Sequence, residues 1–184
     1  YAWRRLANPE TASPYSWFAD IMAIEGVGPV LAGEADPSTL GVTALDDLTL
    51  EVRLSASLPY FALMTTHGST FPSPQWAIEE HGANWTKPEN IVSNGAYVLT
   101  EHIPNERSVR ERSATYWNND ATILDKVVTL VINDENTELT RYLAGEVDKT
   151  DVVPAGQFLR LKAEYPNQAT AFPKLCTYYY TFNV

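Results

Sequence analysis

An α/β fold is the class that this sequence predicts, and a strand–helix–strand pattern at residues 125–153 is the main reason. Residues 127–132 form a continuous apolar, β-branched run, which is typical of a strand covered on both faces. A helix with one apolar face follows, and then a second β-type segment at residues 147–153. Two strands joined in this way are expected to be parallel, with a right-handed crossover.

The helix inside this crossover has a recognisable beginning and end. Asn133 or Asp134 can cap its first turn by accepting a hydrogen bond from a free backbone N–H. Gly145 stands where a residue with a left-handed backbone conformation commonly ends a helix. The apolar face repeats at i, i+3 and i+4 and consists of Leu139, Tyr142 and Leu143.

Short elements precede the crossover and are separated by turn-forming residues. A segment rich in Ser, Thr and Pro at residues 68–74 is the expected crossing between two domains. Helices are expected at residues 1–6, twice within 17–31, at 59–66 and at 75–81, with a β-hairpin at 42–54 and strands at 92–99 and 108–112.

After the crossover, Pro154 is expected to open a helix that ends at Pro166, with Phe158, Leu159 and Leu161 facing inward. Final strands are expected at residues 169–172 and 176–184. The chain opens in what looks like the middle of a helix and ends inside a β-like run, so we expect it to be a piece of a longer protein.

The composition excludes several classes of function. A net charge of −10 with no basic cluster argues against nucleic-acid binding, which needs a basic surface. A single cysteine, Cys176, excludes an internal disulfide and a cysteine-rich zinc site. The longest apolar runs are too short to span a membrane.

No catalytic motif or metal-ligand spacing occurs in the sequence. The three histidines are scattered, and the many carboxylates are better explained by turns, helix caps and solvated faces than by a paired-carboxylate site. We therefore predict no catalytic residue, no metal and no cofactor. The most unusual feature is the tyrosine run at residues 178–180, in which a strand would direct Tyr178 and Tyr180 to one side and Tyr179 to the other.

Six blocks of sequence, in order, resemble one known family: the periplasmic solute-binding proteins of extracellular family 5, the receptors of ABC importers for peptides. The resemblance is to the peptide-binding branch and covers nearly the whole chain. The blocks are YAWRRLANPETASPY at 1–15, LGVTALDDLTLEVRLSASLPYF at 40–61, NWTKPENIVSNGAYVL at 84–99, NERSVRERSATYWNN at 105–119, RYLAGEVD at 141–148 and LCTYYYTFN at 175–183.

The resemblance implies part of a type II periplasmic-binding-protein fold. Residues 1–74 would be part of the small extra domain of the receptor, residues 75–184 would be a segment of the first ligand-binding lobe, and the opposite lobe would be absent. It implies a receptor that captures oligopeptides between two lobes and delivers them to the membrane permease subunits, without catalysis. The protein would be periplasmic, or lipid-anchored at the outer face of the cytoplasmic membrane.

The resemblance also implies particular contacts. Tyr15 and Tyr179 match tyrosines that line the peptide cleft, and residues 151–154 match a stretch whose backbone pairs with the peptide. There the chain has Val152 and Val153 after Asp151, where relatives have asparagines and one more residue, so backbone pairing is expected to persist without the polar side-chain contacts. Cys176 matches a cysteine that pairs with one in the opposite lobe.

The sequence leaves other functions open. Within the family, the ligand could be a murein peptide, a nickel complex or an oligosaccharide, and the peptide-branch blocks argue against the last two. Outside this function, the chain could be a hydrolase with paired carboxylates, or a protein-interaction module that keeps the fold and exposes a large apolar patch.

Overall fold

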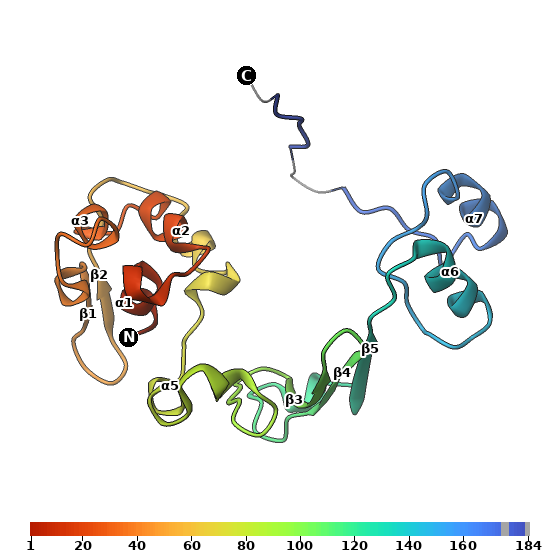
Figure 1. The fold of residues 1–184 in the computed structure, drawn as a ribbon, viewed down its shortest axis with the longest axis horizontal. Coiled ribbons are helices and arrows are strands. Elements are labelled where there is room, and N and C mark those ends of the chain that lie inside the picture. The colour runs from red at the N-terminus through yellow and green to blue at the C-terminus, as the bar shows by residue number, and fades with distance from the viewer. Residues whose placement is uncertain (174–176, 183–184) are drawn as a thin grey trace. The chain divides into compact units, whose positions relative to one another are not determined.

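The computed structural model describes residues 1–173 and 177–182, and it contains two compact units (Figure 1). Unit 1 comprises Tyr1–His102 and Arg110–Val127, and unit 2 comprises Ile103–Val109 and Val128–Val184. The domain boundary expected near residue 74 stays a prediction.

Three short helices open unit 1, as the sequence predicts: α1 (Ala2–Ala7), α2 (Ser16–Ile21) and α3 (Val27–Leu31). A 3₁₀ helix at Pro9–Thr11 connects α1 to α2, and another at Pro37–Thr39 follows α3. Each begins at a proline behind an Asn or Asp cap. The apolar faces of the helices meet in one core, which consists of Leu6, Ala7, Phe18, Ala19, Met22, Ile24, Val27, Val30, Leu40 and Val42.

The predicted hairpin is confirmed. Strand β1 (Val42–Ala44) pairs antiparallel with β2 (Leu50–Val52), with Val42 opposite Val52. Just before β1, Gly41 joins two other segments through its backbone. Its N–H donates to the carbonyl of Glu25 at 2.8 Å, and its carbonyl accepts from the N–H of Arg53 at 2.8 Å.

Two further helices in unit 1 also lie where the sequence predicts them. Helix α4 (Phe61–Met64) is followed by a 3₁₀ turn at Gly68–Thr70, and α5 (Gln75–His81) continues into a 3₁₀ helix at Gly82–Thr86. The Trp3 indole N–H donates to the carbonyl of Thr70 at 2.8 Å, and this hydrogen bond links the 3₁₀ turn at Gly68–Thr70 to α1.

A three-stranded sheet follows, in the order β3 (Tyr97–Ile103), β4 (Arg107–Arg112), β5 (Lys126–Leu130). The strands lie close to the predicted positions, but the predicted burial of the third strand is wrong. Val128 on β5 is 50% exposed, and Val131 just after it is 47% exposed. The strand also lies at the edge of this sheet, where its partner among the described residues is β4. An apolar run does not itself show whether a second layer covers it.

The helix of the predicted crossover is confirmed as α6 (Glu135–Leu143), with Asp134 as its N-cap and Gly145 in a left-handed conformation at φ +77° after it. The second strand of the crossover, predicted at residues 147–153, is not formed: this segment is irregular. The backbone N–H of Asp151 donates to the Glu138 carboxylate at 2.8 Å instead of to a neighbouring strand.

The predicted helix after Pro154 begins later, as α7 (Phe158–Glu164). Leu161 is buried as expected, whereas the inward position of Leu159 is wrong, since its side chain is 81% exposed. The strands predicted at 169–172 and within 177–182 are also wrong, because these residues form no strand. Cys176 lies outside the described residues. Among the described residues, no helix has the length and apolarity needed to cross a membrane.

Acid should weaken the cap of α6. Both the Thr137 hydroxyl and the Thr137 N–H donate to Asp134 Oδ1 at 2.7 Å, and these bonds hold the pKa of Asp134 below its usual value. A lowered folded-state pKa stabilises the fold above the unfolded-state pKa, and that stabilisation disappears as the pH falls through the folded-state value.

We therefore expect the stability advantage of the wild type over Asp134→Asn to be constant near neutral pH and to shrink on acidification below about pH 4. Urea unfolding at a series of pH values measures it. The pKa values of Asp36 and Asp46 are also lowered, but their effect on stability is the same in both proteins and cancels in the comparison. An advantage that stays unchanged down to about pH 2 would contradict this role of the Asp134 carboxylate.

Candidate functional site

Tyr15, the first of the predicted contacts, lies at the N-terminus of α2 in unit 1, where it is the N-cap residue. Its side chain is exposed. The ring centroid lies 6.0 Å from that of Trp17 and 5.3 Å from that of His67. The predicted tyrosine therefore belongs to a group of rings.

This group, the aromatic cluster, consists of Tyr15, Trp17, Phe18 and His67. The His67 ring stacks on the buried ring of Phe18 at 4.3 Å with an interplanar angle of 21°. The Nδ1 atom of His67 interacts with the Ser69 hydroxyl at 2.9 Å and accepts from the Ser69 N–H at 3.3 Å, so the ring is fixed at the start of the 3₁₀ turn. The stacked rings of Phe18 and His67 thus lie beside the exposed rings: Phe18 contacts Trp17, and His67 contacts Tyr15.

Such a cluster is suited to binding, through the faces of its exposed rings, apolar, aromatic or cationic groups. The sequence prediction missed its other three members. Trp17 and Phe18 could have been found, because they adjoin Tyr15 in the chain. His67 could not, because only the fold of unit 1 brings residue 67 beside residue 15.

The second predicted contact is the backbone of residues 151–153 in unit 2. Val152 is exposed and Val153 is half-buried, while Pro154 after them is buried. Among the described residues, the backbone N–H groups of Val152 and Val153 donate no hydrogen bond. A free backbone N–H can pair with a chain added alongside, and β-strand addition requires such groups.

The third predicted contact, Tyr179, is exposed, and it lies between two other exposed tyrosines. The rings of Tyr178 and Tyr180 make an edge-to-face contact at 5.5 Å, at an interplanar angle of 88°. They therefore share a side, as alternation predicts, although the segment is not a strand. Tyr179 and residues 151–153 belong to unit 2 and Tyr15 to unit 1, so their convergence on one ligand stays a prediction.

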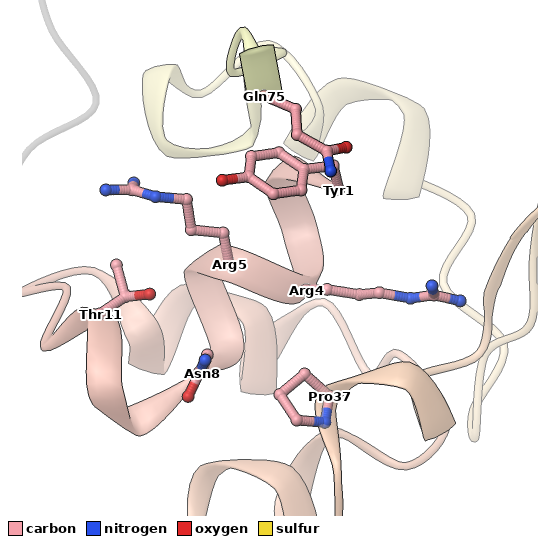
Figure 2. Close-up of a pocket in the computed structure, with 7 residues that line it drawn as sticks. All are labelled: Tyr1, Arg4, Arg5, Asn8, Thr11, Pro37 and Gln75. Atoms are coloured by element: carbon pink, nitrogen blue, oxygen red, sulfur yellow. The ribbon is translucent and has the colours of Figure 1, made fainter. Parts of the chain in front are cut away.

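A hollow of about 450 Å³ in unit 1 lies apart from these residues (Figure 2). None of the predicted contacts lines it. Figure 2 shows the side chains of Arg4 and Arg5 extending in opposite directions, so their charges do not converge on one point. Arg4 also donates to the carbonyl of Val42 at 3.1 Å. The residues that line the hollow are Tyr1, Arg4, Arg5, Asn8, Thr11, Pro37 and Gln75.

The described residues contain no group of three or more His, Cys, Asp or Glu side chains that could hold a metal ion. Several carboxylates form exposed ion pairs instead, among them Glu25 with Arg53 at 3.1 Å and Glu146 with Arg141 at 2.8 Å. The candidate site therefore offers aromatic surfaces and backbone hydrogen-bonding groups.

Comparison with known proteins shows the family to which the chain belongs. The family model for bacterial extracellular solute-binding proteins, family 5, matches residues 1–184. The periplasmic oligopeptide-binding protein OppA of Escherichia coli K12 is 47% identical over the whole chain, which covers 34% of that protein. This chain therefore spans about a third of the length of the curated relatives it matches.

Solved structures show the same relationship. The Escherichia coli murein tripeptide-binding protein MppA matches with a TM-score of 0.88 and 41% identity, over 91% of this chain and 33% of that chain. Haemophilus influenzae OppA, in complex with the peptide RPPGFSPFR, matches with a TM-score of 0.86 and 40% identity, over 90% of this chain and 33% of that chain.

The structure is thus part of a type II periplasmic-binding-protein fold, as predicted. The chain belongs to the bacterial extracellular solute-binding proteins, family 5. This is a family of binding proteins, and the relatives named here are peptide-binding proteins, of which OppA is periplasmic by name.

Proposed function

We propose that this chain is part of the substrate-binding component of an ABC importer, which captures oligopeptides in the periplasm and delivers them to permease subunits in the membrane. The observation that carries this proposal is the 47% identity to an oligopeptide-binding protein over the whole chain. The exposed aromatic rings and free backbone groups of the candidate site support it. The protein acts by binding alone and breaks no bond.

In this proposal, the ligand is an extended peptide enclosed between two lobes. The backbone of residues 151–153 pairs with the peptide as an added strand, which gives affinity with little dependence on the peptide sequence. Tyr15 and Tyr179 contact the ligand through rigid amphipathic rings. The lobes close by a hinge when both touch the peptide.

The domain assignment belongs to the same proposal. Residues 1–74 are part of the small extra domain, and residues 75–184 are a segment of the first lobe. The opposite lobe supplies the other wall of the cleft, and Cys176 forms a disulfide with a cysteine of that lobe.

A murein peptide is the second candidate ligand, and it is favoured by the 41% identity to a murein tripeptide-binding protein. Titration of the gene product at its natural full length with oligopeptides and with murein tripeptide separates the two candidates. Binding of oligopeptides supports the first proposal. Binding of murein tripeptide alone supports murein peptide as the ligand. If neither binds, a protein-interaction module with this fold becomes the better proposal.

Removing the ring of Tyr15 should weaken peptide binding. We expect Tyr15→Ala in the full-length protein to bind oligopeptide about tenfold more weakly, since an aromatic contact of this kind contributes roughly 1–2 kcal/mol. Tyr60→Ala, at another exposed tyrosine of unit 1, should bind like the wild type. Isothermal titration calorimetry measures both. Equal affinities for Tyr15→Ala and the wild type would remove Tyr15 from the site.

A further inference from the structure

Trp17 extends the surface that Tyr15 presents. It is 53% exposed, unusually open for so large an apolar ring. Its ring plane is tilted by 33° from that of Tyr15, and its other ring neighbour is Phe18, which it meets edge-on at 5.8 Å and 76°. Two adjacent exposed rings are therefore accessible to a ligand, and each also contacts a less exposed ring of the aromatic cluster: Tyr15 contacts His67, and Trp17 contacts Phe18.

A free carboxylate lies on the same helix. Asp20 follows Trp17 by three residues in α2, a spacing that brings side chains to the same side of a helix. The Asp20 side chain is exposed, and among the described residues it has neither a hydrogen bond nor an ion pair. Helix α2 itself contains no Lys or Arg to neutralise it.

Ring faces and a carboxylate attract the same type of group. The face of an aromatic ring is electron-rich and attracts ammonium and guanidinium groups, most strongly when the ring is that of tryptophan. An unpaired carboxylate attracts the same cations, and the net charge of −10 adds to this field. An acidic side chain would be repelled, and an uncharged apolar side chain would gain only the contact area of the rings.

We propose that Tyr15, Trp17 and Asp20 form a subsite for a cationic side chain, a lysine or arginine, of the bound peptide. This inference rests on the proposed function, because it assigns a specificity to one part of the same binding site. Trp17 and Asp20 are its specificity-determining residues: the ring holds the methylene stem and the charge from one side, and the carboxylate attracts the charged end.

The test uses alanine-based tetrapeptides that carry either lysine or norleucine, its uncharged analogue of similar length, at each position in turn. Binding to the full-length protein is measured by calorimetry. At one position, lysine should bind more tightly than norleucine. That preference should fall about fivefold in Trp17→Ala and in Asp20→Asn, and Trp17→Phe should retain most of it. Trp76→Ala, at an exposed tryptophan on α5, is the matched control and should keep the full preference.

Each outcome decides the inference. Wild-type protein that binds these peptides with no lysine preference at any position overturns the subsite and leaves the proposed function standing. A preference that survives in both Trp17→Ala and Asp20→Asn also overturns it. If no peptide binds, the proposed function fails and the subsite fails with it.

Discussion

Replacing Met22 with alanine is expected to lower the free energy of unfolding of unit 1 by about 3 kcal/mol. Met22 follows α2 and is 1% exposed, among the most completely buried large side chains of the core. Its removal leaves a cavity among the packed side chains, and the destabilisation combines lost burial with that cavity.

The neighbouring Ile21 provides a matched control, since it is 50% exposed on the same turn of chain. Ile21→Ala should cost less than about 1 kcal/mol, because less apolar surface returns to water and no cavity forms. Urea unfolding followed by tryptophan fluorescence compares the two variants. Similar midpoints would mean that the core under α2 is not packed as described. Because α2 carries Trp17 and begins directly after Tyr15, a loosened Met22 site should also weaken peptide binding.

Gly41→Ala is expected to be the second large effect, with a loss of about 2–3 kcal/mol of unfolding free energy. A Cβ atom at this position would lie 2.9 Å from Cβ of Glu25 and 3.0 Å from the carbonyl oxygen of Arg53. Gly41 is also hydrogen-bonded to the backbone of both residues. The chain cannot relieve the clash without separating segments that it joins.

The control for this prediction is Gly28→Ala in α3, where an added Cβ meets no atom within 4 Å. Alanine is the better helix former, so this variant should be neutral or more stable by up to about 1 kcal/mol. Thermal unfolding by circular dichroism measures both variants. A Gly41→Ala protein as stable as the wild type would show that the backbone junction between residues 25, 41 and 53 is looser than the structure indicates.

Local signals predicted the helices and turns well, because their causes lie within a few residues. Asp134 and Gly145 bound α6 as expected. Pro154 is an exception, because the helix predicted to begin there begins at Phe158. Burial and pairing depend on distant partners and were predicted less well. The apolar run of β5 lies exposed at a sheet edge, and residues 147–153 form no strand because a strand exists only when another segment pairs with it.

The residues of the candidate site come from the resemblance to a family rather than from local physical signals, and their role stays a prediction. Nothing local distinguishes Tyr15 from other exposed tyrosines, and the match to a family block is what singled it out. The family block could not show that His67 lies beside it, since that contact joins residues far apart in sequence. The block also ends at residue 15, so it gives no information on Trp17 and Asp20, which share helix α2.

We propose that this chain supplies one part of a peptide site that is completed elsewhere in the full-length protein. Calorimetric titration of a mixed pool of tri- to pentapeptides into the full-length protein and into the 184-residue chain tests it directly. We predict saturable binding by the full-length protein and none by the shorter chain. Binding by neither protein would contradict the peptide-receptor account, and equally tight binding by the shorter chain would contradict a site that needs a second lobe.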